Sequence, residues 1–249
     1  MAKNSPVSDL NLEKSTPWAF EKCSTCYPII DEHWGCDLDI LKAALRPFKK
    51  PTVVDMGCGP GWHIANLLFL YSGIRRIIGV DYSSRMIGLA RRNIEINHLE
   101  GKVKLIKGDI TKPLFPGKSV ESIYCLNNTL GNIFKKSFGE TKRLRLSTLE
   151  NWRYCLKRKG RLVLSVYNAK KLDLKKDKYG KFFRINRQRS EIDNNDFVIK
   201  VYPPEAKNGI FFYSHWFTEE EITKDMRSCG FLIEGIEKRK ERIVIIARA

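Results

Sequence analysis

The chain has 249 residues, 43% of them hydrophobic, which is enough for one large buried core. Lys and Arg number 45 against 28 Asp and Glu, giving a formal net charge of +17 and a pI near 9.6. No stretch approaches the roughly 18–20 apolar residues of a membrane-spanning helix, and the first residues lack the apolar core of a signal peptide. We therefore expect no membrane contact and a cytoplasmic location.

Strand and helix patterns alternate along most of the chain. Residues 1–50 are interpreted as an N-terminal helical cap, with a helical apolar pattern over 37–48. The elements predicted next are strand 52–56, helix 62–71, strand 75–80, helix 83–97, strand 103–107, strand 120–127, helix 140–157, strand 161–167, a helix starting near Thr218, and a hairpin of the apolar runs 231–236 and 243–247. This order predicts an α/β fold over 51–249, with a doubly wound, mainly parallel seven-stranded sheet that binds ligands beyond the carboxyl ends of its strands.

The most informative segment is a glycine turn after the first strand. Residues 52–62 read TVVDMGCGPGW, so Gly57, Gly59 and Gly61 follow a β-branched run that ends in an acidic residue. Glycine permits positive φ and lets the backbone lie against a ligand, and the following helix directs free N–H groups at the turn. The spacing differs from the G-x-G-x-x-G of dinucleotide-binding turns. We expect a nucleoside-like cofactor here, with another nucleotide on a doubly wound fold as the alternative.

Acidic residues follow the next two strands as well. Asp81 ends the strand 75–80, and Asp109 comes directly after 103–107, followed by Ile110. A carboxylate at the second strand end can accept both hydroxyls of a ribose. A carboxylate and an aliphatic side chain at the third strand end could lie against an adenine ring and its amino group. Three acidic strand ends at one sheet edge are a stronger signal than the glycine turn alone.

With these segments, the chain resembles the class I S-adenosylmethionine-dependent methyltransferases. The matching segments are VVDMGCGPGW, GVDYSSRMIGLARRN and KGDI, followed by a strand around IYCLNN, over about residues 50–167. The resemblance implies an enzyme that uses S-adenosyl-L-methionine as its cofactor, and it implies how that cofactor is held. Asp55 and the glycine turn, with Cys58, would face the methionine end, Asp81 would bind the ribose, and Asp109 with Ile110 would bind the adenine. Tyr82, Met86 and Asn127, from the same matching segments, complete the expected cofactor-binding set.

A stretch at about 168–217 interrupts the alternation before the last helix. It contains three short runs that we interpret as antiparallel strands, at 182–185, 197–202 and 210–216. In similar methyltransferases an insertion at this place often forms a lid or an acceptor pocket. Its aromatic residues could equally form a small satellite core.

Methyl transfer from a sulfonium is an in-line displacement, so the enzyme must hold a nucleophile against the methyl group in a water-poor site. We predict Asn128, Tyr213 and His215 as catalytic residues on the acceptor side, His215 as a base or orienting group. The loop 127–132, NNTLGN, resembles the acceptor-side loop of small-molecule methyltransferases. It lacks the Asn/Asp-Pro-Pro-aromatic signature of nucleic-acid amino-methyltransferases.

These features favour methylation of a nitrogen or oxygen of a small-molecule acceptor. The alternative is methylation of RNA (tRNA or rRNA) or of a protein, because basic residues concentrate at 135–161 and at 170–189, the latter interleaved with aromatic residues. A cofactor-binding protein without catalysis is disfavoured by the intact glycine turn and the acidic strand ends.

Seven cysteines complete the sequence picture. Cys58, Cys125, Cys155 and Cys229 are predicted to be small buried thiols. Cys23, Cys26, His33 and Cys36 form a set that could bind zinc as a Cys3His site, although the spacing matches no structural zinc finger. The other interpretation is a helical segment packed over the cofactor cleft, and we assign no metal ligand to the reaction.

Overall fold

The computed structural model describes residues 37–171, 186–189, 195–201, 210–239 and 241–249. Most of the predicted N-terminal cap, the set Cys23, Cys26, His33 and Cys36, and the predicted strand 182–185 lie outside the described residues. Within the described ranges, no helix is long and apolar enough to cross a membrane.

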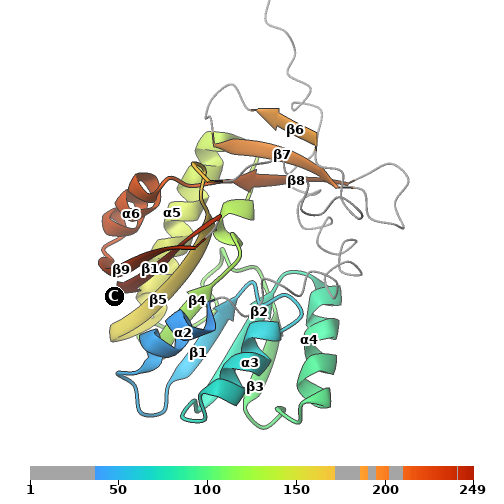
Figure 1. Ribbon diagram of the computed structural model, residues 1–249, viewed down its shortest axis with the longest axis vertical. Helices are drawn as coiled ribbons and strands as arrows, with labels where there is room; N and C mark the ends of the chain where they lie inside the picture. The colour runs from blue at the N-terminus through green and yellow to red at the C-terminus, as the bar shows by residue number, and fades with distance from the viewer. Residues whose placement is uncertain (1–36, 172–185, 190–194, 202–209, 240) are drawn as a thin grey trace, which may run out of the picture.

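The described chain contains a seven-stranded sheet in the order β3-β2-β1-β4-β5-β10-β9 (Figure 1). Neighbouring strands from β3 to β5 pair in parallel, so their carboxyl ends share one edge. The strands are β1 Thr52–Met56, β2 Arg76–Asp81, β3 Val103–Lys107, β4 Val120–Cys125, β5 Leu156–Tyr167, β9 Leu232–Arg239 and β10 Arg242–Arg248. The predicted α/β fold and mainly parallel sheet are confirmed.

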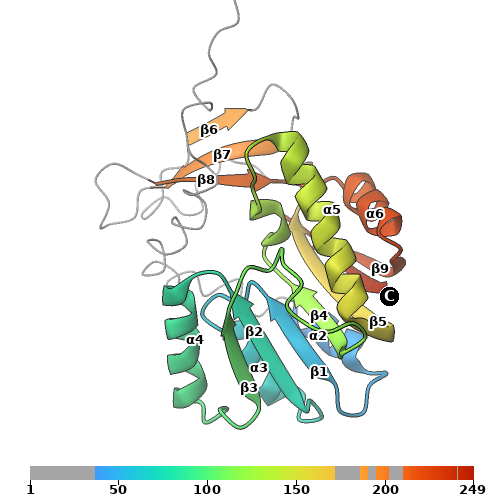
Figure 2. The ribbon, with the colours of Figure 1, turned by 180° about the vertical axis from the view of Figure 1, so that it is seen from behind.

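Helices cover both faces of this sheet. Figure 2 shows α5 lying across one face, and Figure 1 shows α2 and α3 on the other. The helices are α2 Leu38–Leu45, α3 Trp62–Leu70, α4 Ser84–Ile96, α5 Phe138–Cys155 and α6 Glu219–Ser228, with a short 3-10 helix η3 at Leu130–Asn132. Leu149, Trp152 and Ile222 belong to the hydrophobic core on the α5 and α6 face. Leu41 and Leu67 belong to a second core on the α2 and α3 face.

Side-chain caps fix where three of the helices begin. Ser83 Oγ accepts from the Met86 amide at 3.0 Å at the start of α4, and Ser137 and Thr218 cap α5 and α6 in the same way. The cap at Ser137 starts α5 two residues before the predicted position 140.

β5 begins at Leu156, five residues before the predicted start at 161. The reason is an irregular register, because Leu156 pairs with Val120 while Arg161 already pairs with Ser122. The extra residues form a bulge in which Lys159 has φ +65°. A charged bulge interrupts the alternation from which a strand is predicted.

The β9–β10 hairpin closes the sheet in antiparallel fashion, as predicted. β10 pairs with β5 over its whole length, which places Arg242 opposite Tyr167 at the carboxyl end of β5. One buried arginine thereby reaches the edge at which the parallel strands end.

The insertion forms a separate antiparallel sheet in the order β6-β7-β8. Antiparallel strands were predicted for this stretch, but the first described strand follows the predicted 182–185 rather than coinciding with it. Its strands are β6 Asn186–Arg189, β7 Asp196–Val201 and β8 Ile210–His215. A parallel bridge between Asn168 and Phe217 joins the two ends of the insertion. Figure 1 shows this sheet standing beyond the carboxyl edge of the large sheet.

Candidate cofactor and methyl-transfer site

The glycine turn adopts the backbone that its sequence predicts. Gly57, Gly59 and Gly61 have φ angles of +80°, +50° and +80°, and the amides of Gly57 and Cys58 both donate to Val80 O, at 2.8 and 2.9 Å. A Cβ on Gly57 would lie 2.3 Å from Thr129 Cγ2, whereas a Cβ on Gly59 would meet no atom within 4 Å. The turn is therefore packed on one side and open at Gly59.

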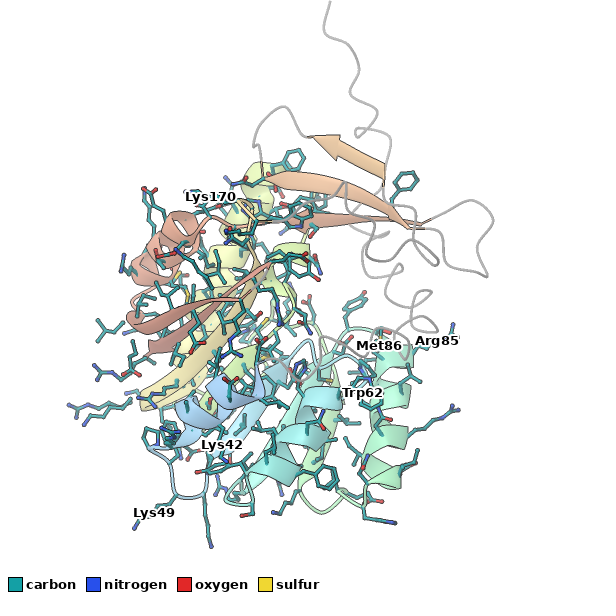
Figure 3. All side chains as sticks on the ribbon, viewed as in Figure 1. Lys42, Lys49, Trp62, Arg85, Met86 and Lys170 are labelled. Carbon is teal, nitrogen blue, oxygen red and sulfur yellow. The ribbon has the colours of Figure 1, made fainter. Side chains whose placement is uncertain are left out.

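Asp81 is held at the end of β2 by two backbone amides. Its Oδ2 accepts from Gly59 N and its Oδ1 from Ser83 N, each at 2.9 Å. The carboxylate consequently joins the glycine turn to the start of α4. Met86, in the first turn of α4, is buried, while Tyr82 is exposed. Figure 3 shows Trp62 and Met86 at the neighbouring ends of α3 and α4.

The third acidic strand end lies beside the second. Gly108 N donates to Asp81 O at 2.9 Å. Asp109, the next residue, therefore follows β3 close to the end of β2. Asp109 Oδ1 accepts from the amide and the hydroxyl of Thr111, at 2.9 and 2.7 Å. Ile110 is buried, and its carbonyl accepts from Trp152 Nε1 at 3.1 Å. The structure thus brings Asp81, Asp109 and Ile110 to one edge.

Asp55 and Cys58 form the buried floor of the turn. Burial raises the pKa of Asp55 well above its ordinary value, and the neighbouring charge of Asp81 adds to this. Burial likewise raises the pKa of the Cys58 thiol, so it behaves as a small apolar side chain. Cys125, Cys155 and Cys229 are buried free thiols too, as predicted.

The loop after β4 packs against the glycine turn and holds two asparagines with left-handed backbone, Asn127 at φ +53° and Asn128 at φ +62°. Asn128 is fully buried. Its Oδ1 accepts from Tyr167 N, and its Nδ2 donates to Ser214 Oγ and His215 O, all at 3.1 Å. Its amide therefore joins β5 and β8 to this loop, contacts that indicate a positioning role.

Tyr213 and His215 lie in a buried polar cluster with Asp196. The Tyr213 hydroxyl donates to Asp196 Oδ1, and His215 Nδ1 lies 2.7 Å from the same oxygen. His215 Nε2 lies 2.8 Å from Glu221 Oε1, and Arg145 Nη1 lies 3.4 Å from the Tyr213 hydroxyl. Both ring nitrogens of His215 are thus engaged with carboxylates.

Burial opposes the charge of His215, but the hydrogen bonds to Asp196 and Glu221 outweigh it and raise the pKa of the ring. A protonated ring without a free lone pair holds elements together rather than removing a proton. The described hydrogen bonds connect neither Tyr213 nor His215 to the glycine turn or to Asp81. Their part in methyl transfer stays a prediction.

The sequence did not predict that Arg242 and Asp37 form a buried ion pair beside the loop after β4. Arg242 Nη1 donates to Asp37 Oδ2 at 2.7 Å and to Asn127 Oδ1 at 2.9 Å. The available signal was a single basic residue at the start of the apolar run 243–247. The partner residues gave no such signal, because Asp37 is 205 positions away.

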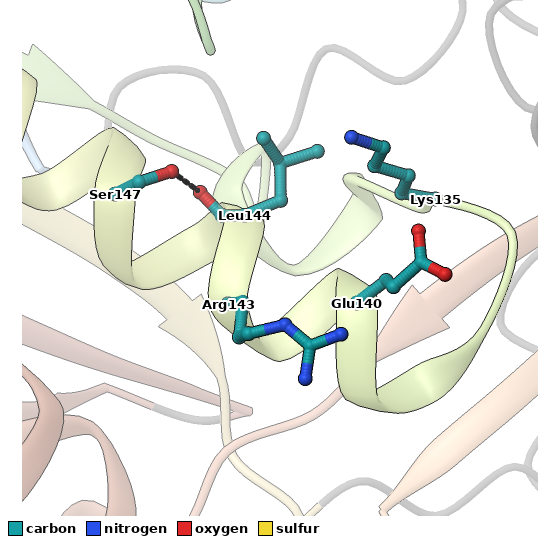
Figure 4. Close-up of a pocket in the computed structure, with 5 residues that line it drawn as sticks. All are labelled: Lys135, Glu140, Arg143, Leu144 and Ser147. Carbon is teal, nitrogen blue, oxygen red and sulfur yellow. Dashed lines mark hydrogen bonds between the residues drawn. The ribbon is translucent and has the colours of Figure 1, made fainter.

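A basic hollow of about 400 Å³ lies on the N-terminal half of α5 (Figure 4). It is lined by Lys135, Glu140, Arg143, Leu144 and Ser147. Its lining comes from the basic stretch 135–161, so it belongs to the surface that the RNA alternative requires.

The sequence matches a known family over the same region. Residues 53–160 match the family described as "Methyltransferase domain". Protein arginine N-methyltransferase 1 of Saccharomyces cerevisiae is 29% identical over 105 residues, covering 37% of this chain and 29% of that protein. The tRNA U34 carboxymethyltransferase of Shewanella baltica is 41% identical over 56 residues, covering 22% of this chain and 16% of that protein. The match thus spans less than a third of the length of these curated relatives.

The fold is shared with solved methyltransferases over nearly the whole chain. The 1,6-didemethyltoxoflavin-N1-methyltransferase of Burkholderia thailandensis, solved with 1,6-didemethyltoxoflavin and S-adenosylhomocysteine bound, superposes with a TM-score of 0.62 at 17% identity, covering 94% of this chain and 87% of that one. Many further S-adenosylmethionine-dependent methyltransferases share the fold.

The family match over residues 53–160 and the shared fold both support a class I S-adenosylmethionine-dependent methyltransferase, the class that the motifs predict. The described residues also fit the methyl donor of this class. The open face of Gly59 leaves room for it, and the fixed carboxylate of Asp81 offers acceptors for ribose hydroxyls.

Proposed function

We propose that this protein transfers a methyl group from S-adenosylmethionine to a nitrogen or oxygen of a small-molecule acceptor. The observation that carries the proposal is the Asp81 carboxylate, held by the Gly59 and Ser83 amides beside an open glycine turn. Gly57, Gly59 and Gly61 would lie along the methionyl end of the donor, Asp81 would bind its ribose, and Asp109 with Ile110 its adenine.

The bound donor supplies an electrophilic methyl group on a positively charged sulfur. Attack by an acceptor nitrogen or oxygen would form the new bond to carbon as the carbon–sulfur bond breaks. Sulfur would keep the electron pair as a neutral thioether, and the acceptor would release one proton to water. Asp81 lies at the edge where positive charge must be accommodated. The protein's remaining task is to orient the acceptor and exclude water.

The insertion supports a small acceptor. Asn128 ties β8 to the loop after β4, so the insertion sheet is fixed to the segment that packs on the glycine turn. A sheet anchored there can cover an acceptor against the methyl group and set its orientation. The Burkholderia thailandensis relative of the same fold, solved with a small molecule bound, supports the same choice.

An RNA or protein acceptor is the second candidate. It is favoured by the net charge of +17 and by the basic hollow on α5. Two of the curated relatives carry names that refer to protein arginine and to tRNA.

The test is transfer of labelled methyl from S-adenosylmethionine into a cell extract, with and without ribonuclease and protease. We expect label in a small-molecule fraction that resists both treatments. Asp81→Ala should reduce incorporation at least about tenfold, because it removes charge-assisted hydrogen bonds to the donor. Glu100→Gln, on the exposed surface, serves as the matched control.

Label that disappears from the macromolecular fraction after ribonuclease would support RNA as the acceptor instead. Label lost after protease would support a protein. No incorporation by the wild type, together with no binding of S-adenosylhomocysteine, would overturn the proposed activity itself.

A further inference from the structure

Arg242 occupies an unusual position for a basic side chain. It lies at the start of β10, opposite the last residue of β5, and is only 9% exposed. A single nitrogen, Nη1, donates to both Asp37 Oδ2 and Asn127 Oδ1. A guanidinium carries five N–H donors, and within the described residues no hydrogen bond uses Nη2 or Nε of Arg242. The side chain therefore has donors to spare.

Its partner Asp37 is incompletely satisfied as well. Asp37 is fully buried directly before α2, and its side chain does not cap that helix. Its Oδ1 accepts no hydrogen bond from the part of the chain that the structure describes. Burial raises the pKa of Asp37, and Arg242 opposes that rise. A buried ion pair with unused donors and an unused acceptor calls for an explanation, since such groups are normally satisfied.

The position of Arg242 beside the loop after β4 explains these unused groups. Asn127 follows β4, and two residues further on Thr129 packs against Gly57 of the glycine turn. Burial, and then the charge of Arg242, lower the pKa of His63 in the first turn of α3 to about 3. The guanidinium is therefore held against the loop after β4, the same loop whose Thr129 packs on the glycine turn.

The charge balance at this edge indicates which group it could bind. S-adenosylmethionine carries a sulfonium, an ammonium and one carboxylate. Asp81 and Asp109 suit the cationic and hydroxyl groups but repel a carboxylate. Among the described residues, the buried arginines are Arg145 and Arg242. Arg145 contacts Tyr213 and the ring of Phe217, whereas Arg242 donates to Asn127 in the loop after β4.

We propose that Arg242 binds the carboxylate of the methionyl group of S-adenosylmethionine, and that Asp37 is the positioning residue that holds its guanidinium. Asn127 shares the same Nη1 and fixes the guanidinium from the side of β4. The proposal rests on the proposed methyltransferase function, and it adds residues from both ends of the chain to the donor site.

The test compares two probes by isothermal titration calorimetry. S-adenosylhomocysteine has the amino-acid group, whereas 5′-methylthioadenosine has the same nucleoside without it. For Arg242→Met we expect the Kd for S-adenosylhomocysteine to rise about tenfold or more and the Kd for 5′-methylthioadenosine to stay within about twofold, since charge-assisted hydrogen bonds are lost only from the first. Arg242→Lys should recover part of the difference because the charge remains.

Matched variants keep the test interpretable. Arg248→Met removes an arginine from the same strand, where Arg248 Nε pairs with Glu234 at 3.0 Å, and should change neither Kd. Because Arg242→Met leaves Asp37 buried without its partner, the double variant Asp37→Asn with Arg242→Met removes both charges and should show the same selective loss.

An equal loss for both probes would mean a purely structural role and overturn the proposal. Unchanged binding of both probes would overturn it as well. A wild-type protein that binds neither probe would instead overturn the proposed function.

Discussion

Gly57 and Gly59 both have positive φ, but an added methyl group would meet different surroundings. At Gly57 it would collide with Thr129 at 2.3 Å, while at Gly59 it would point into open space. Gly57 therefore fits the turn to the loop after β4, and Gly59 leaves room for what the turn holds. The same residue type supports packing at one position and leaves open space two positions later.

This difference predicts separable effects. Gly57→Ala should lower the melting temperature by several degrees, because both the clash and the left-handed backbone oppose it. Gly59→Ala should lower it less, with only the backbone penalty of about 1–2 kcal/mol, but should weaken S-adenosylhomocysteine binding at least about tenfold. Differential scanning fluorimetry and calorimetry measure the two effects.

Gly88→Ala in α4 is the control, because a Cβ there would meet no atom within 4 Å and Ala suits a helix. It should leave binding unchanged. Normal binding by Gly59→Ala would contradict the placement of the donor against this glycine.

At the scale of elements, the joint between the insertion and the rest of the fold is the buried cluster around His215. The ring contacts Asp196 on β7 and Glu221 on α6, and Arg145 reaches in from α5. The pKa of Glu221 is held below its ordinary range mainly by His215, although burial opposes this. Four elements, β7, β8, α5 and α6, therefore meet in this charged cluster.

The joint predicts a pH-dependent stability. The folded protein holds the His215 proton more tightly than the unfolded chain, whose ordinary pKa is 6.5. The contribution of the His215 ion pairs to stability is thus complete below about pH 6.5. It is lost as the pH rises through the higher pKa of His215 in the folded protein. His215→Gln should lower the free energy of unfolding by about 3 kcal/mol at pH 6, because it breaks a buried ion pair. At pH 9 the decrease should be clearly smaller.

Urea unfolding of the wild type and of His215→Gln at both pH values measures this difference. The exposed His98 provides the control in His98→Gln, which should show no comparable change. A cost that is equal at pH 6 and pH 9 would show that the ring is not charged in the folded protein.

The sequence predicted the elements well because their local signals agree. The apolar run 52–56 and the turn that follows it need no distant partner to be recognised, and Ser83 and Thr218 are cap residues at the starts of their helices. The bulge in β5 was missed because its charged residues follow no strand alternation.

The sheet edge that carries Asp81 and Asp109 was also predictable, since each of these residues lies at or just after the end of its own strand. The clusters around Arg242 and His215 were not, because tertiary packing alone brings their members together. Asp37 and Arg242 illustrate the limit, as neither has a neighbour in sequence that indicates the other.

At the scale of the whole molecule, the net charge of +17 predicts a different salt dependence for the two acceptor classes. The hollow on α5 exposes Lys135 and Arg143 to solvent, and polyanion contacts of this kind weaken steeply with salt. For a small-molecule acceptor, raising salt from about 50 to 200 mM should change methyl transfer less than about twofold, whereas several phosphate contacts would cost about a thousandfold in affinity.

The double variant Lys135→Glu with Arg143→Glu sharpens this comparison. We expect it to retain S-adenosylhomocysteine binding and small-molecule methylation while losing non-specific RNA binding in a gel-shift assay. A parallel loss of methyl transfer and RNA binding would favour the nucleic-acid acceptor. Lys49→Glu, on an exposed residue outside the hollow, controls for charge alone.

The bridge between Asn168 and Phe217 has a consequence for how such a protein diversifies. Phe217 N donates to Tyr167 O, and Ala169 N to Phe217 O, both at 2.9 Å, so the chain leaves and rejoins the main domain at one point. A segment with adjacent ends can be lengthened, shortened or exchanged at little entropic cost to the surrounding fold. Descendants of one ancestral gene could therefore acquire new acceptors by replacing this module, while the donor-binding half was inherited unchanged.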